Sequence, residues 1–230
     1  SFDERFRAWI NTYLDDDTAE HDGTRDFRRA LNRGFQLAAM RSVCAAVHNH
    51  RYLLPLAPID LPDPDVFAFR ETLRETAAEV RSLVSSCTNS ADKSLDEIET
   101  LLNFTRRCNR AGNDRERLER VLLAAKPSKK VNGNKKNWDP PEHCTRQKEI
   151  RYELACELER IQQELRAAAL VGILPLAEEF VRDYEWRRRG AGQAEFEDLL
   201  IWARDLLRDN PHVRRDFQSR YRCIMVDEFQ

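Results

Sequence analysis

The sequence predicts a mainly α-helical, multi-helix protein. Hydrophobic residues make up 41% of the chain and charged residues 34%, and only seven of the 230 residues are glycine, a composition typical of long amphipathic helices. Apolar residues also recur every three or four positions along most of the chain, which is the period of a helix with one buried face. The apolar run Ile224-Met225-Val226 is instead typical of a buried strand, because both of its faces would be covered.

Two helices and a connector are predicted first. Apolar side chains from Phe2 to Leu14 fall on one face and indicate a helix, which the acidic run 15–17 and Asp22-Gly23 close. A second, unbroken helix is expected over about residues 25–48. Four prolines at positions 55, 58, 62 and 64 then exclude regular structure, because each fixes φ and restricts the residue before it.

The middle of the chain is predicted to hold three more helices. The stripe from Val66 to Val84 marks the third, and Ser94 with Glu97 forms a capping box that begins the fourth. This fourth helix should end near Arg107, and Gly112-Asn113 separates it from a fifth helix over about 114–125.

A long helix follows, with apolar residues from Ile150 to Leu165 on one face. A kink or break is expected between Gly172 and Pro175, because proline removes a backbone donor and collides with the preceding turn. Helix resumes over 176–189. The segment from Phe196 to Leu207 has the clearest amphipathic pattern in the chain.

A basic loop, either ordered or disordered, is predicted over Lys126–Pro141, a stretch rich in lysine and asparagine with a double proline. No acidic residue lies between its lysines, so the local field is positive and could hold DNA phosphates. A solvated lysine loop is the alternative. Trp138 could stack on a base or tether the loop to the surface. The lysines are Lys126, Lys129, Lys130, Lys135 and Lys136.

Composition also limits the kinds of binding site and the cellular location that fit the chain. The formal net charge is only −2, so any contact with nucleic acid must come from local basic patches. The six cysteines include no Cys-x-x-Cys pair, which argues against a zinc or iron-sulfur module. The chain shows neither a membrane-spanning stretch nor a leader segment, so no membrane partner and a cytoplasmic location are expected.

An acidic pair, Asp227-Glu228, directly follows the predicted strand. In open α/β sheets, ligands bind where strands end. One carboxylate there can anchor a metal ion while its neighbour orients or deprotonates an attacking water. An acidic turn without chemistry is the other interpretation of this pair alone.

Residues 196–230 carry a more specific pattern. A Phe-x-Asp-Leu-Leu helix, a short segment containing Pro211 and an Arg-Tyr pair precede the sequence Asp-Glu-Phe-Gln. This order resembles the approach to the second helicase motif, Asp-Glu-x-Gln, in superfamily 1 DNA helicases of the UvrD and RecB (AddA-like) kind. Gln230 favours that superfamily over helicases with Asp or His at this place.

The resemblance implies roles and a domain division. Asp227 would hold the Mg²⁺ of bound ATP, Glu228 would be the base for the hydrolytic water, and Gln230 would sense the nucleotide. Residues 15–189 would form a helical insertion (1B-like) domain, with a possible motor-domain helix at 1–14. Residues 190–230 would be a fragment of the α/β P-loop motor domain that ends at the Walker B motif.

The resemblance also implies what is missing. None of the glycines is followed by lysine, so the phosphate-binding Gly-x-x-x-x-Gly-Lys-Ser/Thr loop is absent from these residues. The chain is therefore expected to be inactive alone, with ATP and Mg²⁺ bound only by the intact protein. That protein would be an ATP-dependent 3′ to 5′ helicase acting on single-stranded and duplex DNA in repair and recombination, with nuclease or recombination subunits as candidate partners. The alternative is a non-catalytic helical module that binds protein or DNA.

Overall fold

The structure, a computed structural model, describes residues 1–14, 22–223 and 225. Within these residues every regular element is a helix, and the β structure is limited to an isolated bridge between Cys87 and Trp138. The mainly α prediction is therefore confirmed. The α-helices are α1 (Phe2–Leu14), α2 (Asp22–Asn32), α3 (Leu37–Asn49), α4 (Val66–Leu83), α5 (Lys93–Asn109), α6 (Arg115–Ala124), α7 (Pro141–Gly190), α8 (Phe196–Asp209) and α9 (Pro211–Arg220). Short 3-10 turns lie at Arg51–Leu53, Val84–Ser86 and Lys135–Asn137.

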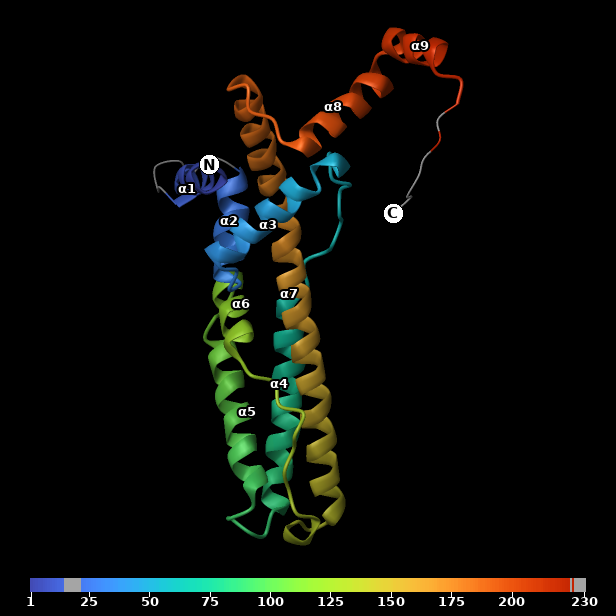
Figure 1. Ribbon diagram of the computed structural model, residues 1–230. Coiled ribbons are helices and arrows are strands. Elements are labelled where there is room, and N and C mark those ends of the chain that lie inside the picture. The colour runs from blue at the N-terminus through green and yellow to red at the C-terminus, as the bar shows by residue number, and fades with distance from the viewer. Residues whose placement is uncertain (15–21, 224, 226–230) are drawn as a thin grey trace.

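Helix α7, which is 50 residues long, is the spine of the molecule (Figure 1). Its N-terminal half runs beside α4 and α5 in an elongated bundle, and α6 sits at the end of α5. Its C-terminal half carries α1, α2 and α3. Helices α8 and α9 project away from this body and lead to the C-terminus.

Three apolar clusters share successive stretches of α7. Ile150 joins the first cluster, around Trp138; Leu154 to Leu165 join the second, with α4, α5 and α6; Ala169 to Val181 join the third, with α1, α2 and α3. Each fully buried aliphatic side chain contributes about 1.5–3 kcal/mol relative to an exposed one. A single helix therefore contributes one side of every core cluster among the described residues.

The predicted second helix is wrong as a single element. The chain turns at Gly34, where φ is +87°, and α2 and α3 lie on either side. The left-handed conformation favours glycine because other residues place Cβ against the backbone there. The amide of Phe35 donates to the carbonyl of Ala30 at 3.0 Å and closes the turn. The apolar stripe continues across this turn, which is why periodicity alone missed it.

Two further local predictions are corrected. Of the kink or break expected between Gly172 and Pro175, the break does not occur, because α7 runs through Pro175. Ile173 and Leu176 beside it are buried in one core cluster, and this packing compensates for the lost donor. The capping box of Ser94 is also wrong: Asp92 caps α5 and accepts the amide of Ser94 at 2.9 Å.

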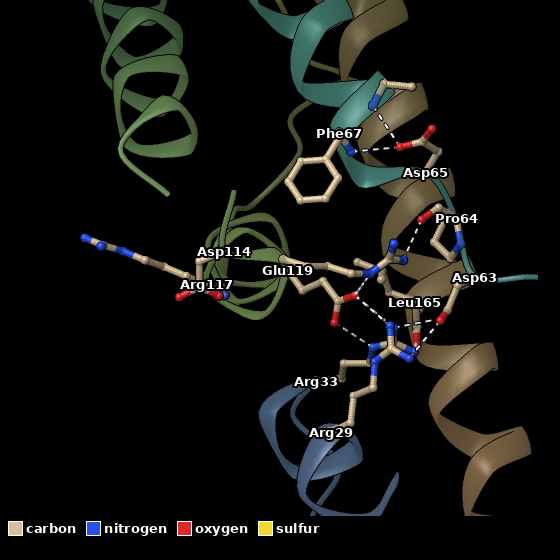
Figure 2. Close-up of polar contacts among 12 residues, drawn as sticks. Arg29, Arg33, Asp63, Pro64, Asp65, Phe67, Asp114, Arg117, Glu119 and Leu165 are labelled. Atoms are coloured by element: carbon tan, nitrogen blue, oxygen red, sulfur yellow. Dashed lines mark hydrogen bonds and ion pairs between the residues drawn. The ribbon is translucent and has the colours of Figure 1, made fainter. Parts of the chain in front are cut away.

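A buried ion pair fixes α2 to α6 (Figure 2). Nε of Arg33 lies 2.9 Å from Oε2 of Glu119, and each side chain is only 2% exposed. Arg33 also reaches Asp63 of the proline-rich connector at 2.8 Å. Burial opposes ionisation of Glu119, but Arg33, Arg115 and Arg29 together outweigh it and lower the pKa of that carboxyl. The network holds the N-terminal helices against the bundle, since removing either partner would leave the other charge buried with fewer opposite charges around it.

Candidate functional site

The residues with predicted nucleotide roles, Asp227, Glu228 and Gln230, lie outside the described residues. The structure instead describes the segment that leads to them, α8 and α9. Helix α9 begins at Pro211, where Asn210 caps it by accepting the amide of His212 at 3.1 Å. Proline is well suited to a first turn because its missing N–H has no partner there in any case. The Pro-containing helix of the motif is therefore present.

The start of α8 is anchored by the buried carboxylate of Asp198. Nη2 of Arg51 donates to Asp198 Oδ1 at 2.7 Å, and Arg188 donates to Oδ2. The same carboxylate accepts the amide of Glu195 at 2.7 Å and so caps the helix. Asp198 thereby links three separate elements: α8, the end of α7 and the turn after α3.

The environment of this anchor keeps Asp198 ionised. Burial opposes ionisation, but the hydrogen bonds from the Glu195 amide and Arg51 outweigh it and lower the pKa of Asp198. In Glu185, 2.9 Å from Arg51, burial prevails and raises the pKa of the carboxyl. Burial and Arg51 together lower the pKa of His48, so its imidazole favours the neutral form. The charged groups around Asp198 all contact one another, so this arrangement indicates a structural anchor rather than a catalytic centre.

The amphipathic pattern of α8 is confirmed, but its apolar face is uncovered. Phe196 is 74% exposed, Leu199 53% and Leu200 56%. Phe217 and Tyr221, at the end of α9, are exposed as well. Monomeric proteins rarely expose apolar side chains gathered on one helix face, so this face indicates a contact site.

The basic loop is anchored to the bundle at several points. Asn132 donates its amide to Glu97 at 3.0 Å, and Arg151 donates to the carbonyl of Asn132 at 2.8 Å. Gly133 lies so close to α7 that a Cβ there would stand 2.8 Å from Nε2 of Gln147. Trp138 is 3% exposed, so it tethers the loop and does not offer a face for stacking.

Asp92 holds the far end of the basic loop. Its Oδ2 accepts from the side chain of Asn137 at 2.7 Å and from the amide of Asn134 at 3.1 Å. Burial opposes ionisation, but these bonds and those from Ser94 outweigh it and lower the pKa of Asp92 to about 2. Hydrogen bonds thus fix the loop from Asn132 to Asn137.

All five lysines of this loop are exposed. Lys129 lies 2.5 Å from Glu159 of α7. Among the described residues the other four, Lys126, Lys130, Lys135 and Lys136, have no ion-pair partner. The loop therefore presents uncompensated positive charge on an ordered backbone, which suits binding of polyanions.

Sequence reasoning misses the roles of Arg51, Asp198, Glu119 and Glu97. From the sequence alone the helix dipole explains Asp198 and a capping box explains Glu97, yet each makes contacts with residues far away in the sequence. Charged residues are frequent throughout this chain, so no local signal distinguishes the few that are buried. Over the residues that the structure describes, no cluster of His, Cys, Asp or Glu could hold a metal ion, and no helix is long and apolar enough to cross a membrane.

The chain is similar to known helicases in sequence. The family model described as the UvrD/REP helicase N-terminal domain matches residues 66–230. An ATP-dependent helicase/nuclease subunit from Carboxydothermus hydrogenoformans is 37% identical over 76 residues, which are 32% of this chain and 6% of the relative. The exonuclease/helicase subunit RexA of Streptococcus pneumoniae serotype 4 is 36% identical over 52 residues, 23% of this chain and 4% of the relative. The chain therefore matches only a small part of each relative's length, and no solved structure matches it.

Proposed function

We propose that this chain is part of an ATP-dependent DNA helicase, because it belongs to the UvrD/REP helicase N-terminal domain family. The observation that carries the proposal is the family match over 66–230, which includes both the anchored α8 and the acidic pair at Asp227 and Glu228. The protein would use ATP hydrolysis to move 3′ to 5′ along single-stranded DNA and to separate strands, in DNA repair and recombination, in the cytoplasm.

The acidic pair would take part in binding and hydrolysing the nucleotide. Asp227 would bind Mg²⁺, usually through water, since carboxylate oxygens suit this hard cation. Glu228 would accept the proton of the hydrolytic water, and Gln230 would respond to the nucleotide state. When bound, Mg²⁺ neutralises charge on the phosphates of ATP.

The domain division follows from the same premise. Residues 15–189 would be the helical insertion, 1–14 a helix of the motor domain and 190–230 the approach to the nucleotide site. The exposed apolar face of α8, with Phe196 and Leu199, supports this division, because a motor core would cover such a face. Asp198 would then join the insertion to the motor at a fixed point.

The protein would bind both single-stranded and duplex DNA, and the basic loop would contact DNA through its five lysines, from Lys126 to Lys136. Its uncompensated charge supports this assignment. The matched relatives are named as helicase/nuclease and exonuclease/helicase subunits, so we propose an assembly with nuclease or recombination subunits.

The proposal is tested by ATP hydrolysis in two polypeptides. The 230-residue chain has no glycine-lysine phosphate loop, so it should show no turnover with or without DNA. The full gene product should contain that loop ahead of these residues and hydrolyse ATP when DNA is added. If the full gene product contains no such loop, the result contradicts the proposal and favours the non-catalytic helical module.

A further inference from the structure

A groove of about 480 Å³ lies between α5, α7 and the basic loop. Its floor is apolar. Leu154 and Leu158 of α7 and the half-buried Leu101 and Phe104 of α5 line it. These side chains belong to the second core cluster, so the groove exposes the edge of a packed core. Its volume is in the range of about 300–1,000 Å³ found for sites of small organic groups.

The rim of the groove is cationic. Arg107, Lys126 and Lys130 line it, and none of the three has an ion-pair partner among the described residues. Glu97, the acid in the lining, already accepts hydrogen bonds from Arg151 and Asn132. An apolar floor bordered by three uncompensated cations fits a ligand that has apolar faces and negative charges close together.

We propose that this groove binds single-stranded DNA, with a base against Phe104 and its phosphates beside Arg107, Lys126 and Lys130. The inference rests on the proposed function and specifies the form of DNA that the basic loop takes. Single strands present the faces of their bases, which stack on aromatic side chains, while flanking cations bind the backbone. A duplex keeps those faces inside its own stack, so the apolar floor would remain unused.

The test uses the 230-residue chain and a short oligothymidylate that contains one 2-aminopurine. Binding is followed by anisotropy, and stacking by quenching of the 2-aminopurine fluorescence. Phe104→Leu keeps an apolar side chain but removes the aromatic face. It should weaken binding about 5-fold or more and reduce the quenching.

Two charge variants separate the groove from the rest of the loop. Lys126→Ala with Lys130→Ala removes charge from the rim and should weaken binding, lowering the salt slope by about 0.7 for each lysine. Lys135→Ala with Lys136→Ala removes the same charge from loop positions that do not line the groove. Affinity should therefore fall as for any lost loop lysine, but the quenching at saturation, which reports stacking on Phe104, should stay unchanged. Arg107→Ala, at an exposed position, repeats the rim test if Phe104→Leu fails to fold in circular dichroism.

The outcomes distinguish this inference from the proposed function. Equal or tighter binding of a duplex, with Phe104→Leu and Arg107→Ala neutral, overturns the groove site and leaves the DNA contact of the loop intact. Displacement of the oligonucleotide by polyglutamate as readily as by unlabelled oligothymidylate also overturns it, since the site would then be a general anion surface. Failure to bind either DNA contradicts both the groove site and the DNA contact.

Discussion

Nη2 of Arg51 lies 2.7 Å from Oδ1 of Asp198, although 147 residues separate them in the sequence. Arg51 belongs to the turn after α3, and Asp198 to the first turn of α8. Side-chain exposure is 2% for Arg51 and 7% for Asp198. Since α8 leads toward the acidic pair, this ion pair fixes where the predicted motor segment departs from the helical body.

Asp198→Ala should release α8 from the body. The substitution removes the carboxylate that Arg51 and Arg188 share, but Arg51 keeps Glu185 and both arginines keep Glu195, so the cost should be about 1–3 kcal/mol. Hydrogen exchange measured by mass spectrometry should show faster exchange in α8 and in residues 51–53.

The matched control for this release is Asp209→Asn, because Asp209 pairs with Arg208 at an exposed position of the same helix. That variant should exchange like the parent protein, since exposed pairs contribute little. Unchanged exchange of α8 in Asp198→Ala would show that other contacts hold the helix.

The turn at Gly34 gives a prediction about stability. Gly34→Ala places a Cβ at φ +87°, where no atom lies within 4 Å, so the cost is backbone strain rather than a clash. Strain in the left-handed region should lower the free energy of unfolding by about 1–2 kcal/mol. Urea denaturation measures the change.

Gly190→Ala is the matched control for that strain. Gly190, the last residue of α7, also has open space around its Cβ position but no positive φ. This variant should be neutral or slightly stabilising, because alanine favours helix. If both substitutions destabilise the protein equally, the left-handed conformation of Gly34 does not explain why α2 and α3 are separate helices.

Periodicity in the sequence predicted most of the helices because each carries a regular apolar face. The stripe of α7 from Ile150 to Leu165 is an example, and all of it lies in core clusters. The turn at Gly34 was missed, and the sequence did not decide between a kinked and a broken helix at Pro175. Both depend on whether tertiary packing outweighs a local preference, and a local pattern does not contain that information.

The site was predictable in part. The residue composition predicted a basic loop at Lys126–Pro141, and the structure shows an ordered, hydrogen-bonded segment there. The ion pairs of Asp198 and Glu119 were not predictable, because their partners come from distant helices and every helix carries similar charges. The nucleotide roles of Asp227 and Glu228 rest on the motif and stay predictions.

Asp92 should make the basic loop sensitive to acid. Its folded-state pKa, about 2, is below the ordinary value of 3.8, so its contribution to stability is present above pH 3.8. That contribution is lost as the pH falls from about 4 toward 2. Hydrogen exchange of the amides of Ser94 and Asn134 should accelerate over this window.

Asp92→Asn tests the cause of this acid sensitivity. The variant cannot ionise at this position, so exchange of the two amides should be faster at neutral pH and should lose that part of its pH dependence. An unaltered pH profile in the variant would assign the acid sensitivity to other carboxyl groups.

Replacing the lysines of the basic loop by alanine should weaken binding of single-stranded DNA and lower its salt dependence. Each phosphate contact that is lost reduces the slope of log K against log salt by about 0.7. Filter binding across a salt series measures this change. An unchanged affinity and slope would eliminate the loop as a DNA contact.

We propose that the acidic pair Asp227-Glu228 binds Mg²⁺ and activates water for ATP hydrolysis. The most direct measurement is the DNA-stimulated ATPase rate of the full gene product carrying Glu228→Gln, with Glu153→Gln at an exposed position of α7 as the control. Loss of a general base should lower turnover about 10²–10⁴-fold while ATP binding is retained. Turnover equal to that of the control would contradict the claim.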